Sequence, residues 1–69
     1  MCLYNIQENA LITGEEILNA VIYSLSGKEV YQENNVLSSK IVLPNLPVGI
    51  YFARMLTKGG TKNLKFLIF

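Results

Sequence analysis

Apolar and polar residues alternate over short stretches of this chain, and turn-forming residues interrupt the alternation. An alternation with a period of two is that of a β-strand with one buried face. The interruptions come about every eight to twelve residues, which is typical of an all-β sandwich. Strands are expected at residues 3–6, 10–13, 18–25, 29–33, 39–43, 51–56 and 62–69.

The alternation also predicts which face of each longer strand is buried. In residues 18–25 the polar Asn19 must face solvent, so the even-numbered positions face inward. Arg54 and Lys65 set the outward faces of the last two strands in the same way. The residues expected inside are Leu18, Ala20, Ile22, Ile41, Leu43, Tyr51, Ala53, Met55, Leu64, Phe66 and Ile68.

Turn-forming residues predict how these strands connect. Residues 14–16 are expected to end the second strand, and Gly27 is the pivot of a tight connection after the third. Further turns are expected at residues 34–35 and 58–61. Pro44 is expected to end the strand before it, because proline has no amide hydrogen for the ladder.

Residues 15–22 also allow a helix. They contain plausible helix formers, and Thr13 precedes them as a candidate cap. A β-branched and aromatic run follows directly, which favours a strand. We therefore expect a strand here and keep the helix as the alternative.

The most informative short motif is Leu46-Pro47-Val48-Gly49-Ile50-Tyr51-Phe52. A Gly two residues before a Tyr at the start of a strand is the signature of a tyrosine corner, whose hydroxyl bonds to the backbone a few residues upstream. Gly49 would allow the turn through a positive φ angle or through close approach of the ring. The motif predicts a small immunoglobulin-like β-sandwich of about six to seven antiparallel strands.

The composition predicts one small and unusually apolar domain. The chain has 69 residues, which suits a single domain over residues 1–69. Hydrophobic residues make up 51% and charged residues only 16%, against a usual charged share of about 25%. Either a missing strand, a partner or a second copy covers part of the apolar surface, or the chain builds a dense all-β core.

The net charge, the lengths of the apolar runs and the single cysteine give no reason to expect several common roles. The net charge of +1 gives no electrostatic reason to expect nucleic acid or an anionic membrane. No apolar run approaches the length of a membrane span, and residues 1–5 lack the features of a signal peptide. Cys2 is the single cysteine, so it forms no internal disulfide and is expected to be a small apolar residue near the chain end.

The residue types argue against a catalytic role for this chain. It contains neither His nor Asp, which removes the usual general bases and most metal sites. The adjacent Glu15 and Glu16 would point to opposite faces of a strand, or both would meet water in a turn. Glu29 and Glu33 lie on one strand face, which is interpreted as solvated. Gly59-Gly60 is a turn and not a phosphate loop. No catalytic residue, cofactor or metal is predicted.

Aromatic and basic side chains suggest two candidate binding surfaces, and the sequence decides neither. Tyr23, Tyr31 and Phe52 are expected to face outward, where they could stack on a sugar, although exposed aromatics more often pack or protect an edge. Arg54 and Lys65 are expected to face each other across the last hairpin. A solubilising face explains these cations better than a binding stripe.

Three motifs, taken in order, resemble a known family. They are Val21-Ile22-Tyr23-Ser24-Leu25-Ser26-Gly27-Lys28-Glu29-Val30, then Leu43-Pro44-Asn45-Leu46-Pro47-Val48-Gly49-Ile50-Tyr51-Phe52, then Gly60-Thr61-Lys62-Asn63-Leu64-Lys65-Phe66-Leu67-Ile68. Together they resemble the type A C-terminal sorting domain of the type IX (Por) secretion system of Bacteroidota. The resemblance covers about residues 8–69, and residues 1–7 match poorly, as a truncated first strand would.

The resemblance implies a non-catalytic signal at the C-terminus of a secreted cargo protein. The type IX translocon would bind the domain, and a sortase-like peptidase would remove it. The cargo would pass through the periplasm to the cell surface or the medium. The positions implied for recognition are Lys62, Lys65, Phe66, Leu67 and Ile68, and those implied for structure are Gly27, Lys28, Leu46, Gly49 and Tyr51.

Two other functions remain open from the residues themselves. An apolar chain that lacks a first strand would expose an unpaired edge, so a structural immunoglobulin-like module could act by edge-strand pairing or self-association. A small carbohydrate-binding sandwich would use Tyr31 or Phe52 for stacking.

Overall fold

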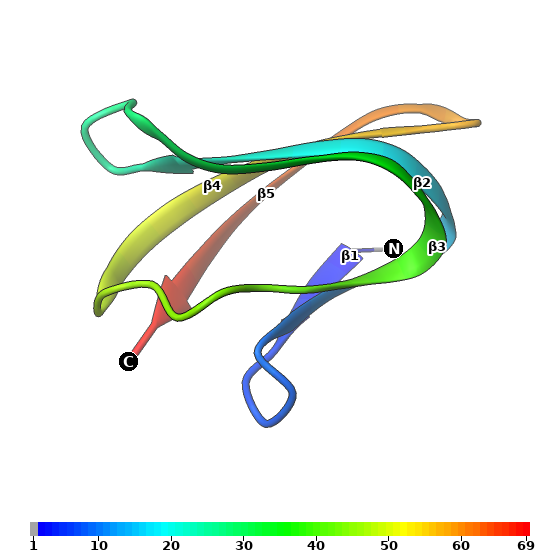
Figure 1. Ribbon diagram of the computed structural model, residues 1–69. Coiled ribbons are helices and arrows are strands. Elements are labelled where there is room, and N and C mark those ends of the chain that lie inside the picture. Colours follow the sequence, from blue (N-terminus) through cyan, green and yellow to red (C-terminus); the bar gives the residue numbers. More distant parts are fainter. Residues whose placement is uncertain (1) are drawn as a thin grey trace.

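The computed structural model describes residues 2–69, which form an antiparallel all-β fold with no helix. Two of the strands are long, and Figure 1 shows them running side by side and bending together at one end of the molecule. This confirms the expected fold class. The strands are β1 (Cys2–Asn5), β2 (Ala10–Ser24), β3 (Glu29–Val42), β4 (Gly49–Thr57) and β5 (Gly60–Ile68).

Strand β2 holds the two layers of the sandwich together. Its first part, near Leu11, pairs with β1 on one side and with the end of β3 on the other. Its second part, from Ile17 to Ser24, pairs with β4 and with the start of β3. Strand β5 then pairs with β4 at the edge of the larger layer. One continuous sheet therefore folds over itself to enclose the core (Figure 1).

Residues 2–69 form five strands where the sequence predicted about six to seven, because two expected turns are bends inside strands. Residues 14–16 do not end a strand; the register of β2 shifts between Ile12 and Ile17, and the chain continues. Residues 34–35 likewise lie within β3, where Asn35 and Leu37 have positive φ angles of 54° and 53°. Bulges of this kind bend and twist a strand without reversing it.

The buried face agrees with the predicted alternation except near the bend. The residues buried as expected are Ala20, Ile22, Ile41, Leu43, Tyr51, Ala53, Met55 and Phe66. Leu64 and Ile68 are half-buried and pack against the core. Leu18, which was expected inside, is only half-buried. Ile17 is fully buried in its place. The register irregularity between Ile17 and Asn19 moves the alternation by one position there, and a one-residue slip exchanges the two faces.

Residues 15–22 are strand, so the helical alternative is wrong. The segment lies between two neighbouring strands; Ala20, for example, faces Glu33 of β3 and Met55 of β4. Ladder hydrogen bonds on both sides and burial of Ile17 and Ile22 outweigh the local helix propensity.

The predicted turns at Gly27 and at residues 58–61 are both present. Gly27 has a φ angle of 90°, which suits glycine, and its amide donates to the Ser24 carbonyl oxygen at 2.9 Å. Thr57 and Gly60 close the β4–β5 hairpin. Strand β3 ends at Val42, just before Pro44, as expected. The first turn joins β2 to β3, and the second joins β4 to β5.

Candidate functional site

The β4–β5 hairpin carries most of the residues that the sequence singled out for function. Alternation along β4 places Tyr51, Ala53 and Met55 toward the core and leaves Phe52 and Arg54 on the other side. Strand β5 continues this division. The hairpin therefore has an inner face that holds the fold together and an outer face that meets solvent.

The tyrosine corner is present at the start of β4. The Tyr51 hydroxyl donates a hydrogen bond to the Pro47 carbonyl oxygen at 2.5 Å, four residues upstream. The Tyr51 ring stacks on the Phe66 ring, with the ring centroids 5.9 Å apart. The Phe66 ring also packs against the ring of Tyr4 in β1, with the centroids 4.9 Å apart. Phe66 thus links the end of β5 to both layers of the sandwich.

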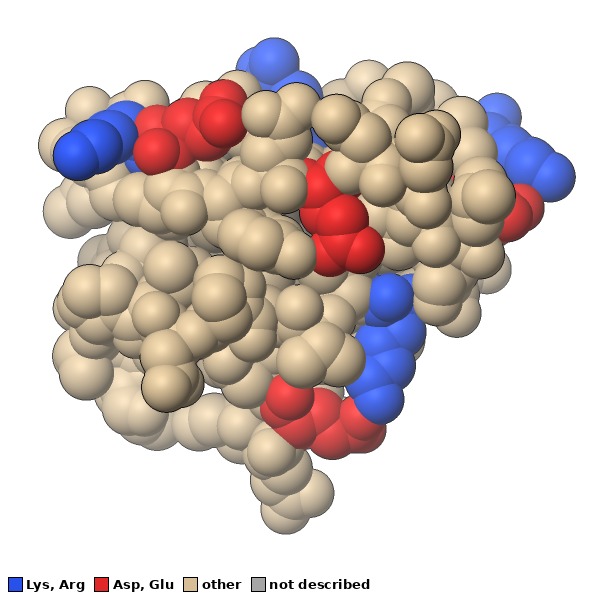
Figure 2. Space-filling model, in the orientation of Figure 1, with Lys and Arg blue, Asp and Glu red and all other residues tan. Residues whose placement is uncertain are grey.

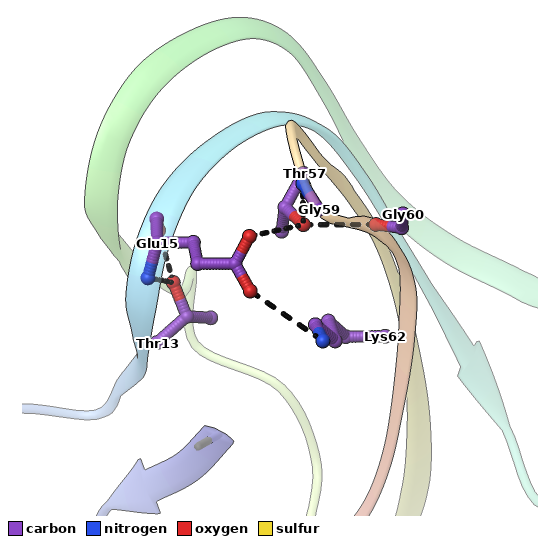
Figure 3. Close-up of polar contacts among 6 residues, drawn as sticks. All are labelled: Thr13, Glu15, Thr57, Gly59, Gly60 and Lys62. Atoms are coloured by element: carbon purple, nitrogen blue, oxygen red, sulfur yellow. Dashed lines mark hydrogen bonds and ion pairs between the residues drawn. The ribbon is translucent and has the colours of Figure 1, made fainter.

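At the other end of the hairpin, Glu15 joins the bend of β2 to the β4–β5 turn (Figure 3). Its carboxylate lies 3.4 Å from the Lys62 ammonium and 3.3 Å from the Thr57 hydroxyl. That hydroxyl also lies 2.9 Å from the Gly60 carbonyl oxygen and accepts the Gly59 amide hydrogen. These contacts fix the tip of the hairpin against the bend.

Because Gly59 has no side chain, the Glu15 carboxylate can lie directly against the turn. A Cβ atom built on Gly59 would lie 2.2 Å from Glu15 Oε2, far inside normal contact. Any larger residue would therefore push the carboxylate away from the turn. The bulge at residues 14–16 supplies the other half of this arrangement, because it directs Glu15 toward the hairpin.

The surroundings of Glu15 favour its charged form. Desolvation by neighbouring atoms is the largest single influence and would raise the pKa of Glu15. The charge of Lys62 and hydrogen bonds from Lys62, Thr57 and Gly59 together outweigh it, so the pKa of Glu15 lies below its ordinary value. Glu15 therefore stabilises the folded state at neutral pH, and this contribution is lost as pH falls through its folded-state pKa.

We expect Glu15→Gln to make stability less dependent on pH. The parent should lose stability relative to the variant as pH is lowered from neutral through about 4, where free glutamate titrates. Urea unfolding of both proteins at a series of pH values measures the difference. Glu16→Gln is the matched control, since Glu16 pairs only with exposed Lys58. Parallel curves for the parent and Glu15→Gln would contradict the assignment.

The five positions proposed for recognition lie in β5 but differ in accessibility. Phe66 is buried in the core, and Lys62 is half-buried beside Glu15. Ile68 is half-buried and packs against the core. Lys65 and Leu67 are exposed, so among these positions they are the ones open to a partner. The proposed role of all five remains a prediction.

The structural motif positions lie at two turns. Gly27 and Lys28 form the β2–β3 turn, with Lys28 exposed. Leu46 is half-buried against the core just before β4. Gly49 has a φ angle of 158°, and a Cβ atom there would lie 3.9 Å from Tyr51 Cε2, an ordinary contact. Close approach of the Tyr51 ring therefore does not by itself require glycine.

Two expectations about surface side chains are wrong. Tyr31 does not face outward: it pairs with buried Ile22, packs against the core and donates a 2.6 Å hydrogen bond to Glu33. A register shift beside Ile22 changes the alternation of β3 there. Arg54 and Lys65 do not face each other directly either. Arg54 faces Asn63 and Lys65 faces Phe52, so the two cations are diagonal neighbours.

The few charged side chains are mostly paired. Lys40 pairs with Glu8, Lys58 with Glu16 and Lys62 with Glu15. On the face drawn in Figure 2, several basic groups lie beside acidic ones and wide uncharged areas separate them. Within residues 2–69 no three Cys, His, Asp or Glu side chains come together as metal ligands. The same range contains no helix able to cross a membrane.

Comparison with known protein families gives one match. The model of the secretion system C-terminal sorting domain, a domain of type IX secretion, matches residues 4–69, which include every strand from β2 to β5. The chain belongs to this family. Searches of curated proteins and of solved structures found no match.

Membership confirms the resemblance carried by the three sequence motifs, and the match begins four residues earlier than that resemblance. The sorting domain is a C-terminal secretion signal of the type IX system, and this implies involvement with that machinery and a secreted or cell-surface destination. Its family is not a family of enzymes.

Sequence reasoning missed the Glu15 contacts of the sorting domain. Glu15 was assigned to a solvated turn, and its partners Thr57 and Lys62 lie more than forty residues further along the chain. The one local sign was a polar pair inside an apolar stretch. That sign does not distinguish a turn from a bulge, so the contact depends on the three-dimensional fold.

Proposed function

We propose that the folded sandwich is itself the sorting signal, and that the type IX translocon and then a sortase-like peptidase bind it. The family match carries this proposal, because it extends over residues 4–69 and so covers the two layers and not one short peptide. A signal of this kind needs a stable and distinctive surface. The domain would be joined to the C-terminus of a cargo protein.

The attachment of the C-terminal hairpin at two points supports this proposal. Strand β5 is anchored by Phe66 in the core at one end and by the Lys62–Glu15 contact at the other. Between these anchors Lys65 is exposed. Because both ends are fixed, a partner could bind this strand without a large cost for ordering it. The cargo would cross the periplasm before reaching the surface.

A secretion assay tests the proposal. Residues 1–69 are fused to the C-terminus of a reporter that carries its own signal peptide, in a host with an active type IX system. We expect the reporter in the medium or at the cell surface, and we expect it to stay in the periplasm of a strain without the translocon. The measurement is the reporter activity in each fraction.

The result that contradicts the proposal is retention in both strains while the domain is folded. That result would favour the structural alternative, in which an edge strand pairs with another chain. The structural alternative is suggested by β5, which pairs with β4 and with no second strand of residues 2–69. One side of the β5 backbone is therefore open to pairing with another chain. Circular dichroism of the purified fusion provides the folding control.

A further inference from the structure

The solvent side of the larger layer is unusually apolar. We call this side the outer face; it includes Tyr23 of β2, Phe52, Arg54 and Leu56 of β4, and Lys65 and Leu67 of β5. The solvent side of an antiparallel sheet is usually polar. Here Phe52, Leu56 and Leu67 are 37%, 42% and 46% exposed. Three large apolar side chains therefore meet solvent on the outer face.

The strand register joins these side chains into a continuous strip. Tyr23 faces Phe52, and Phe52 in turn faces Lys65. The two aromatic side chains and the Lys65 cation therefore form one row across three strands. Leu56 lies two positions beyond Arg54 on the same strand face. Residues two apart on one strand and opposite each other on neighbouring strands touch on one surface.

Three shallow hollows lie next to one another along this strip. The central one is lined by Tyr23, Phe52, Arg54 and Lys65, among others. Arg54 also borders the hollow beside Leu56, and Lys65 borders the one beside Leu67. The two cations thus stand at the boundaries between hollows, where one bound chain could reach both of them.

These two cations differ from most of the other basic side chains. Lys40, Lys58 and Lys62 each pair with a glutamate, whereas Arg54 and Lys65 have no carboxylate partner among residues 2–69. They are diagonal neighbours on adjacent strands, so their charges repel. An anionic group placed between them would relieve this repulsion and form charge-assisted hydrogen bonds.

We propose that the outer face docks a protein segment that presents apolar side chains and a carboxylate, the apolar groups filling the hollows and the carboxylate meeting Arg54 and Lys65. This inference rests on the proposed sorting function, for which the segment would belong to the secretion machinery. The aromatic pair provides the anchor, and the two cations fix the position and orientation of the segment.

A second copy of the chain fits this face less well. Packing two outer faces together would bury Arg54 of each copy between them. The acid that shares a cross-strand row with these residues is Glu29, which faces Tyr23 on β3, at the opposite end of the row from Lys65. Arg54 would be desolvated without a carboxylate partner, which is costly.

A sugar also fits less well. Sugars stack on aromatic rings, but Leu56 and Leu67 extend the apolar strip on both sides of the aromatic pair. Aliphatic side chains at those positions suit the side chains of a polypeptide better than hydroxyl groups.

The secretion assay with paired charge variants tests this proposal. Arg54→Gln with Lys65→Gln should lower reporter export by about tenfold or more, because two charge contacts to the partner are lost. Lys40→Gln with Lys58→Gln is the control: it gives the same net charge and breaks two ion pairs away from the outer face. Export should be retained in that control and in Arg54→Lys with Lys65→Arg.

Stability measurements separate docking from folding. Purified residues 1–69 of each variant should melt within a few degrees of the parent, since both altered side chains lie on the surface. Phe52→Ser should reduce export while the domain remains folded. Equal export of the outer-face and control variants, with the parent exported, would overturn the docking proposal and leave the sorting function intact. Failure of the parent itself would instead count against the sorting function.

Two further results would assign the outer face to another occupant and so overturn the proposal. One is a concentration-dependent dimer in sedimentation equilibrium that Phe52→Ser abolishes. The other is binding of an oligogalacturonate, the probe for an anionic sugar, that Arg54→Gln with Lys65→Gln abolishes while export is unchanged. We expect a monomer and no binding of this sugar.

Discussion

Replacing Tyr51 by alanine is expected to unfold this domain. Its ring is buried and stacks on Phe66, and its hydroxyl closes the corner onto Pro47. Loss of a buried aromatic side chain costs about 3–5 kcal/mol, and whole domains are stable by only about 5–15 kcal/mol, with small ones at the low end. Urea unfolding followed by circular dichroism should show little or no folded baseline for Tyr51→Ala.

Tyr51→Phe divides this effect into packing and hydrogen bonding. The variant keeps the ring and removes the bond to Pro47, so it should lose about 1 kcal/mol and still unfold cooperatively. If Tyr51→Ala has the same unfolding midpoint as the parent, the corner does not hold the two layers together. If Tyr51→Phe is as destabilised as Tyr51→Ala, the hydroxyl and not the ring is the main contribution.

Removal of residues 65–69 is expected to abolish both export and the folded state. This segment pairs with the first half of β4 and contains Phe66, which contacts Tyr4 and Tyr51. The deletion would open one end of the core and expose Tyr51 to water. A loss of export in this variant would therefore say little about recognition. The measurements are export of the fused reporter and the thermal melt of the shortened domain.

A shorter deletion provides the control. Phe69 is 75% exposed and lies beyond the end of β5, so its removal should leave the melt unchanged. Export by the chain without Phe69 then shows whether the last side chain takes part in recognition. A cooperative melt after removal of residues 65–69 would contradict the role given to Phe66.

Local patterns in the sequence predicted the parts of the site that depend on alternation and turn chemistry. The corner at Tyr51, the turn at Gly27 and the division of β4 into an inner and an outer face all follow from neighbouring residues. The outward direction of Arg54 and Lys65 follows in the same way. The prediction that Arg54 and Lys65 face each other across the hairpin was wrong, because the register of the two strands depends on how the turn at residues 58–61 closes.

Bulges account for most of the remaining errors. Residues 14–16 and 34–35 have the composition of turns, and composition does not distinguish a reversal from a bend in a continuing strand. Register shifts between Ile17 and Asn19 and between Ile22 and Tyr23 moved Ile17 into the core and turned Tyr31 inward. Each of these bends and shifts depends on pairing with a strand that is distant in the sequence, so a short stretch of sequence does not predict it.

The sequence by itself determined the strand content, the family and the absence of the common catalytic residues, because these depend on residue types and short spacings. Tertiary structure alone decided what lies together. It brought Glu15 to the β4–β5 turn, Tyr4 to Phe66, and Arg54 and Lys65 to neighbouring positions beside an aromatic pair. The physical reason is that contacts between distant segments are set by strand register and bending, and these are fixed when the whole sheet closes on its core.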